Sequence, residues 1–89
     1  MTAHENFIKS TLPKCEIDHW LIENGWTFYS KGCYHCTGGY VNQYADKTNL
    51  KIGVNPKKNI CILRKNNYVR GREMNLEKLK IKLNEYVKH

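Results

Sequence analysis

The hydrophobic periodicity of this chain changes twice along its length, and this constrains the fold more than any other feature. Residues 17–21 and residues 76–87 repeat apolar side chains at the spacing of one helical face. Residues 50–54 instead alternate at every position, which is typical of a half-buried strand. The apolar positions of the two helical stripes are Ile17, Trp20 and Leu21, followed by Leu76, Leu79, Leu83 and Val87.

The two helical patterns have recognisable ends. Pro13 suits a first helical turn and Gly25 suits a C-terminal cap, which predicts the first helix over residues 13–24. Asn75 is placed to cap the second helix, which should end near residue 87. Residues 1–11 are polar and are predicted to form a flexible arm. Residues 12–89 have the length of a single domain.

Segments with strand composition occupy the region between the two helices. They cover residues 26–30, residues 33–44 with an interruption at Gly38-Gly39, residues 50–54 and residues 60–64. The order predicts an α+β fold: a helix, an antiparallel sheet of three to five strands, and a helix. Both helices should pack on one sheet face to bury their apolar stripes, which leaves the opposite face open.

Tyrosines are expected on that open face. A two-residue turn at Lys31-Gly32 would pair Tyr29 with Tyr34 across a hairpin, with Tyr40, Tyr44 and Lys51 as further candidates. Tyrosine rings beside basic residues can stack on unpaired bases. Tyrosine is also a common strand residue, so half-buried rings without a binding role are the alternative.

The charge of the chain favours a polyanionic partner. Fifteen Lys and Arg residues against eight Asp and Glu give a net charge of +7, and the positive excess lies within residues 47–89. We therefore predict a nucleic-acid-binding domain, with RNA the favoured partner. The alternatives are a lysine-rich solvated surface, or a protein-interaction domain. The predicted nucleic-acid-binding residues are Tyr29, Lys31, Tyr34, Lys57, Lys58, Arg64, Arg70 and Arg72.

The four cysteines allow one metal hypothesis. Cys33 and Cys36 form a C-x-x-C, and Cys15 and His19 lie one helical turn apart, so these four could complete a zinc site. The alternative is thiols that pack as small apolar side chains, as expected for Cys61. A second C-x-x-C is absent, and we therefore predict no cofactor, with zinc as the alternative.

The apolar runs are too short for a membrane segment. The longest is Ile60-Cys61-Ile62-Leu63, whereas a spanning helix needs about 20 apolar residues. We therefore expect a cytoplasmic protein without a membrane partner.

One motif suggests an enzyme. The sequence Gly25-Trp26, then Lys31-Gly32, then His35 resembles the HicA-type mRNA interferase toxins. The resemblance implies a fold similar to double-stranded-RNA-binding domains and RNA cleavage with His35 as the acid or base. The other residues favour a binding domain over an enzyme, so a small ribonuclease remains a second alternative.

Overall fold

The computed structural model describes residues 15–46 and 48–87, apart from the side chain of Val87. The predicted arm over residues 1–11 and Pro13 itself lie outside this range. The predicted start of the first helix at residue 13 is wrong, because Cys15 is extended, with a φ of −149°, and caps a helix that begins at Glu16. No helix in these two ranges is long and apolar enough to cross a membrane. The elements in chain order are α2 (Glu16–Glu23), β1 (Thr27–Lys31), β2 (Asn42–Ala45), β3 (Leu50–Asn55), β4 (Ile60–Lys65), β5 (Tyr68–Met74) and α3 (Leu76–Val87).

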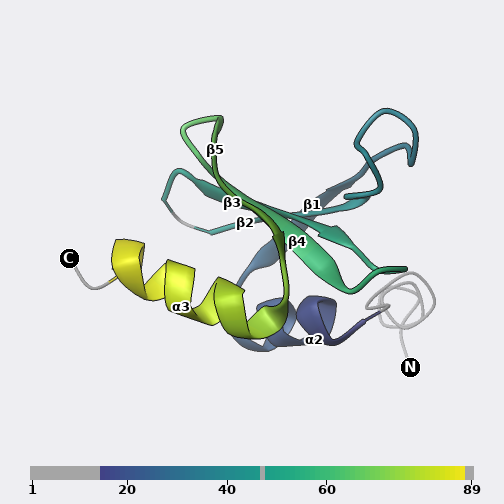
Figure 1. The fold of residues 1–89 in the computed structure, drawn as a ribbon. Helices are drawn as coiled ribbons and strands as arrows, with labels where there is room; N and C mark the ends of the chain where they lie inside the picture. Colours follow the sequence, from purple (N-terminus) through teal and green to yellow (C-terminus); the bar gives the residue numbers. More distant parts are fainter. Residues whose placement is uncertain (1–14, 47, 88–89) are drawn as a thin grey trace, which may run out of the picture.

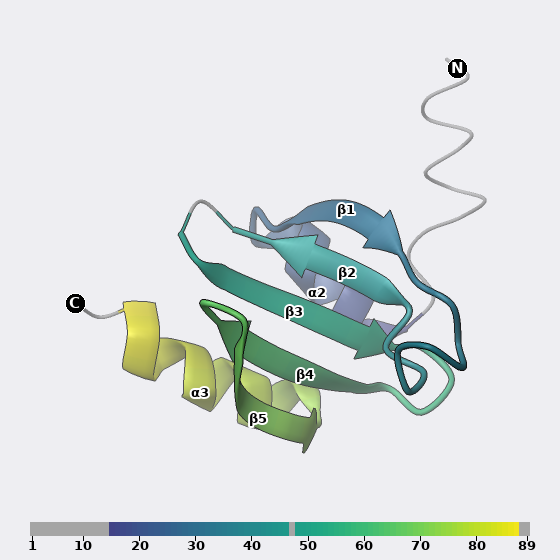
Figure 2. The same ribbon diagram turned by 90° about the horizontal axis from the view of Figure 1, so that it is seen from above.

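The strands form one antiparallel sheet of five strands in the order β1-β2-β3-β4-β5 (Figure 2). Each strand therefore pairs with its neighbour in the sequence, and turns or loops make all the connections. These findings confirm the α+β class and the antiparallel sheet, at the upper end of the predicted strand number.

The core contains alternate residues of the central strands together with residues of both helices. Ile52 on β3 and Leu63 on β4 are opposite each other and fully buried, as period-two alternation requires. In Figure 1, α2 and α3 both lie below the strands. The helical residues of the core cluster are Ile17, Leu21, Leu76, Leu79 and Leu83.

The helix ends follow the predicted signals. Gly25 follows the C-cap residue Asn24 of α2 and has a φ of 85°, the left-handed conformation that ends a helix. Before α3, the side-chain oxygen of Asn75 accepts the backbone N–H of Lys78 at 2.9 Å. Both capping predictions are confirmed.

The predicted hairpin at Lys31-Gly32 is wrong. β1 instead pairs with β2, so that Lys31 is opposite Asn42 and Phe28 is opposite Tyr44. A compact turn replaces the expected strand over residues 33–39. In this turn the carbonyl of Cys33 accepts both the N–H of Thr37 at 3.0 Å and its hydroxyl at 2.8 Å.

Two glycines explain why the segment turns. Gly38 and Gly39 have φ angles of 66° and 93°, which permit the chain to leave a helical turn and re-enter the sheet. Tyr29 and Tyr34 are consequently not partners across a hairpin. Tyr44, a candidate for the open face, is fully buried, and its ring packs edge-on against Phe28 with the ring centroids 5.6 Å apart.

A buried carboxylate connects α2 to β2. Asp18 is fully buried, and its Oδ1 accepts the hydroxyl of Tyr44 at 2.6 Å and the amide of Asn42 at 3.0 Å. Its Oδ2 accepts the backbone N–H of Cys15 at 3.2 Å and the Cys15 thiol at 3.1 Å. Burial, reinforced by the bond to Asp18, raises the pKa of Tyr44 well above its usual range. The network fixes α2 relative to the sheet.

Candidate nucleic-acid interface

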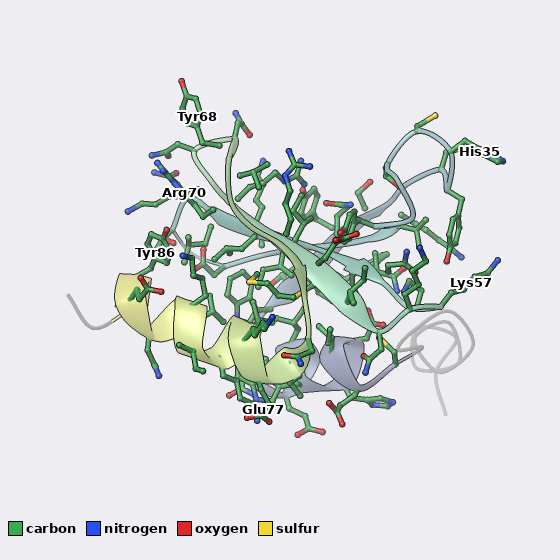
Figure 3. All side chains as sticks on the ribbon, in the orientation of Figure 1. His35, Lys57, Tyr68, Arg70, Glu77 and Tyr86 are labelled. Atoms are coloured by element: carbon green, nitrogen blue, oxygen red, sulfur yellow. The ribbon has the colours of Figure 1, made fainter. Side chains whose placement is uncertain are left out.

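Positive charge is concentrated in the strands and their connections. Residues 27–72, which we call the basic layer, contain nine Lys and Arg residues and a single acidic residue, Asp46. The helices carry most of the acidic side chains in the described part of the chain, with Glu16, Asp18 and Glu23 on α2. Figure 3 shows the same separation, because Glu77 lies on the helical side whereas Arg70 and Lys57 lie beside the strands.

In Figure 1 two segments rise above the strands, whereas α2 and α3 lie below them. One is the loop over residues 32–41 and the other is the turn between β4 and β5. His35 extends from the loop, and Tyr68 extends from the β4–β5 turn (Figure 3). The basic layer therefore has two projections, each with an aromatic or imidazole ring near its end.

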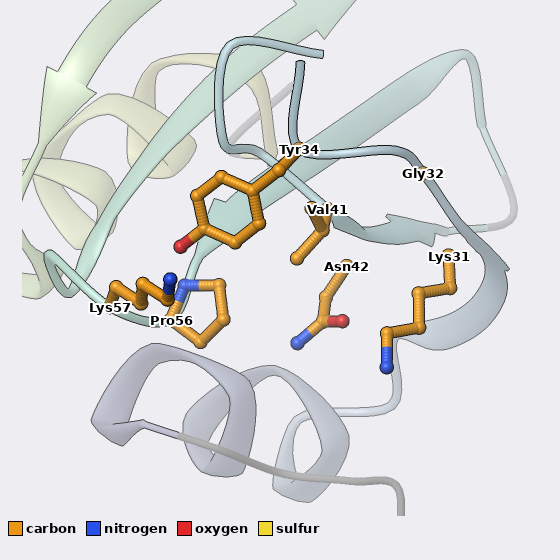
Figure 4. A pocket seen from close by; sticks show the side chains of 7 residues that line it. All are labelled: Lys31, Gly32, Tyr34, Val41, Asn42, Pro56 and Lys57. Atoms are coloured by element: carbon orange, nitrogen blue, oxygen red, sulfur yellow. The ribbon is translucent and has the colours of Figure 1, made fainter. Parts of the chain in front are cut away.

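The first projection borders a cavity of about 410 Å³, which we call the end cavity (Figure 4). Three predicted binding residues, Lys31, Tyr34 and Lys57, meet in its lining. The Lys57 ammonium lies 4.6 Å from the centre of the Tyr34 ring, within the range of a cation–π contact. The complete lining is Lys31, Gly32, Tyr34, Val41, Asn42, Pro56 and Lys57.

Tyr29 lies on β1 but does not line the end cavity, although Lys31 of the same strand does. It is the extra residue where the register between β1 and β2 shifts, and its side chain is 47% exposed. The Lys51 ammonium lies 5.6 Å from the centre of its ring. The sequence analysis named Lys51 only as a further candidate for the open sheet face, whereas the structure places its ammonium group over the Tyr29 ring.

Tyr68 was missed by the sequence analysis. Its side chain is 69% exposed, and the Arg70 guanidinium lies 6.0 Å from the centre of its ring. Asn66 and Asn67, with φ angles of 52° and 69°, form the tight turn that projects it. An Asn-Asn pair between two strand-like segments is a hairpin signal that could have revealed this position.

The remaining predicted arginines and lysines occupy different environments. Arg64 is half-buried in the sheet and donates a hydrogen bond from its Nη2 atom to Oε1 of Gln43 at 2.7 Å. Lys58 is exposed in the β3–β4 turn, and Arg72 is exposed on β5. Arg64 is therefore a structural residue of the sheet as much as a binding candidate, while Lys58 and Arg72 are accessible cations.

The sheet surface away from the core is partly covered by the chain itself. A Cβ atom placed on Gly53 would lie 3.1 Å from the Cβ of Tyr40, so the loop over residues 32–41 passes close above β3. The Gln43 amide also donates to the carbonyl of Tyr40, which holds this loop down. The surface open to a ligand is therefore not a flat sheet face. It is divided between the two projections.

The four zinc candidates are not assembled into a site. Within residues 15–46 and 48–87, no three His, Cys, Asp or Glu side chains lie close enough to hold a metal ion. Cys15 bonds to Asp18, and burial raises its pKa to about 11. Cys33 and Cys36 are exposed in the turn, and His19 is exposed on α2.

Cys61 matches its expected packing role. It is fully buried, and burial raises its pKa to about 12. The remaining candidate, His35, is exposed at the end of its loop (Figure 3).

A separate hollow lies on the helical side, outside the end cavity. It measures about 530 Å³, and its lining includes Trp20, Trp26 and Leu83.

No protein-family model, curated protein or solved structure matches the chain. The function is therefore inferred from the geometry and chemistry of the described residues.

Proposed function

We propose that this protein is a small nucleic-acid-binding domain that contacts its ligand, preferably RNA, through the basic layer. The observation that carries the proposal is the near absence of acidic residues from residues 27–72, against nine cations. Lysine and arginine side chains neutralise phosphates and release their counterions, which drives binding without sequence preference. Asp46 is the only carboxylate of this layer that would oppose an approaching phosphate backbone.

Aromatic rings paired with cations strengthen this proposal. Tyr29, Tyr34 and Tyr68 each have a Lys or Arg group over the ring. Such a pair offers a stacking surface for a base and a positive charge for the adjoining phosphate. The proposal also takes both helices to lie on one sheet face, so that the ligand approaches from the other side, where the two projections rise.

The test is the salt dependence of RNA binding. A labelled single-stranded RNA and a duplex RNA should bind at about 50 mM salt and much more weakly at about 200 mM. The double variant Arg70→Gln/Arg72→Gln should reduce the slope of log affinity against log salt by up to about two, because two phosphate contacts are lost. Lys78→Gln is the control, since Lys78 is exposed on α3. It removes one charge and is therefore compared with Arg72→Gln alone, which should reduce the slope by up to about one.

Three results would contradict the proposal. They are no RNA binding at about 50 mM salt, an affinity that does not change with salt, or equal effects of the α3 control and the β5 variants. The first two would favour a partner protein as the ligand. Loss of intact RNA during the assay, abolished by His35→Ala, would instead indicate a ribonuclease.

A further inference from the structure

We propose that the end cavity holds one unpaired nucleotide of a single-stranded nucleic acid. In this arrangement the base stacks on the Tyr34 ring, and the Lys31 and Lys57 ammonium groups bind the phosphates on either side of it. The inference rests on the proposed function. It adds the site at which the nucleic acid is held and the requirement that the bound nucleotide be unpaired.

The Tyr34 ring is held in place before any ligand arrives. Its hydroxyl donates to Oδ1 of Asn55 at 3.1 Å, and the same oxygen accepts the backbone N–H groups of Lys57 and Lys58, each at 3.1 Å. Gly39 lies so close that an added Cβ would be 3.2 Å from the ring. A fixed ring loses little conformational freedom when a base stacks on it, which favours binding.

The chemistry of the lining matches a nucleotide. Tyr34, Pro56 and Val41 supply apolar surface, while the only charged side chains in the lining are the two lysines. In Figure 4, Tyr34 and Pro56 lie on one side of the cavity, close to Lys57, and Lys31 lies on the other. A phosphate on either side of a stacked base would therefore find its own cation.

The size of the cavity favours a single-stranded ligand over a duplex. Its volume of about 410 Å³ is within the range of small-molecule sites, so it can take one base but not a base pair with its duplex. A base within a duplex is already stacked and paired, and extracting it costs free energy. The cavity should therefore bind unpaired nucleic acid in preference to paired nucleic acid. Positive charge alone would distinguish the two poorly, because both carry phosphates.

Two neighbouring lysines provide a matched pair of variants. Lys57 and Lys58 are adjacent in the same turn and both are exposed, but only Lys57 lines the cavity and lies over Tyr34. Lys57→Gln and Lys58→Gln remove the same charge. Binding by charge alone predicts equal losses for the two variants, whereas the end cavity predicts a larger loss for Lys57→Gln.

The experiment measures fluorescence anisotropy with an octauridylate RNA and a 12-base-pair RNA duplex at about 50 mM salt. Tyr34→Ala should weaken octauridylate binding by roughly 5- to 150-fold, the range for one stacked base, and change duplex binding less than twofold. Tyr29→Ala should affect the octamer less than Tyr34→Ala does, since Tyr29 lies outside the cavity lining. Uridine monophosphate should bind much more weakly than the octamer, because it lacks the second phosphate.

The possible failures can be told apart. If wild-type protein binds both RNAs but Tyr34→Ala matches Tyr29→Ala, and Lys57→Gln matches Lys58→Gln, the end-cavity proposal is overturned and the general function stands. If neither RNA binds, the function fails and the cavity proposal fails with it. Equal affinity for uridine monophosphate and the octamer would overturn the single-strand assignment in favour of a free nucleotide.

A measurement on the wild-type protein guards against variants that do not fold. In a ¹H–¹⁵N correlation spectrum, the octamer should shift the backbone amide signals of Gly32, Val41 and Lys57, which surround the cavity. Shifts confined to β5 and the β4–β5 turn, with these three signals unchanged, would overturn the proposal.

Discussion

The hydrogen bond from Tyr44 to Asp18 gives a quantitative prediction about stability. Tyr44→Phe removes only the hydroxyl, which donates to the buried carboxylate at 2.6 Å, and retains the ring that packs against Phe28. A hydrogen bond to a charged group contributes about 1.5–3 kcal/mol. Asp18 keeps its bonds from Asn42 and Cys15, so the loss should stay within this range.

The assay is urea unfolding followed by circular dichroism, with the free energy of unfolding extrapolated to water. Tyr68→Phe is the matched control, because Tyr68 is 69% exposed and losing its hydroxyl should change stability by less than about 0.5 kcal/mol. If Tyr44→Phe is as stable as the wild type, or if both variants lose equally, the Asp18 network does not stabilise the fold as inferred.

The same variant has a pH signature. The pKa of Tyr44 is raised in the folded state, so its stabilising contribution is complete below the ordinary tyrosine pKa of about 10 and is lost as the pH rises above that value. Above about pH 10 the unfolded chain releases this proton and the folded chain does not. The wild-type advantage over Tyr44→Phe should then shrink by up to about 1.4 kcal/mol per pH unit. A constant difference across this range would contradict the raised pKa.

Two further predictions concern a thiol and a glycine. Iodoacetamide at about pH 7.5 should alkylate Cys33 before Cys15 and Cys61. The backbone N–H groups of Cys36 and His35 lower the pKa of Cys33, whereas burial raises the pKa of Cys15 to about 11 and that of Cys61 to about 12. Equal alkylation rates in peptide mass mapping would contradict this prediction. Gly53→Ala should cost about 1–3 kcal/mol in urea unfolding, because its Cβ would lie 3.1 Å from Gln43, Ile62 and Tyr40. An unchanged unfolding midpoint would show that the loop above β3 moves aside at little cost.

The elements that could be predicted from sequence are those determined by local signals. The alternation over residues 50–54 corresponds to β3, and the stripe beginning at Leu76 corresponds to α3. Gly25 and Asn75 marked helix ends because capping depends on residues within one turn. In each case the physical cause lies within a few residues of the signal.

The segment around Tyr34 could not be assigned in this way. Its composition suits a strand, and Gly38-Gly39 fits a bulge or a turn equally well. The contact that decides its position is the bond from Tyr34 to Asn55, which is 21 residues further along the chain. The same applies to Asp18, an acidic residue in a first helical turn whose buried partners Asn42 and Tyr44 lie 24 and 26 residues away.

The sequence pointed to individual candidate residues but did not predict that some of them would lie together in one cavity. Lys31, Tyr34 and Lys57 were all expected to bind nucleic acid, yet nothing in their spacing indicated that they line one cavity. Their meeting depends on the turn over residues 33–39 and on the β3–β4 turn. Tyr68 was missed because no strand was predicted after residue 64, whereas the Asn66-Asn67 turn leads into β5 and exposes Tyr68.

The order of the strands has a consequence for how the chain folds. Because β1 to β5 pair only with their sequence neighbours, each hairpin can close before the next segment is needed. Short closures lose less chain entropy, and folding rates rise as contacts become more local. α2 packs beside β1, and α3 beside β4 and β5, so the helices also join elements close to them in the chain. A domain with this order can assemble progressively as it leaves the ribosome, with β5 and α3 completing the core last.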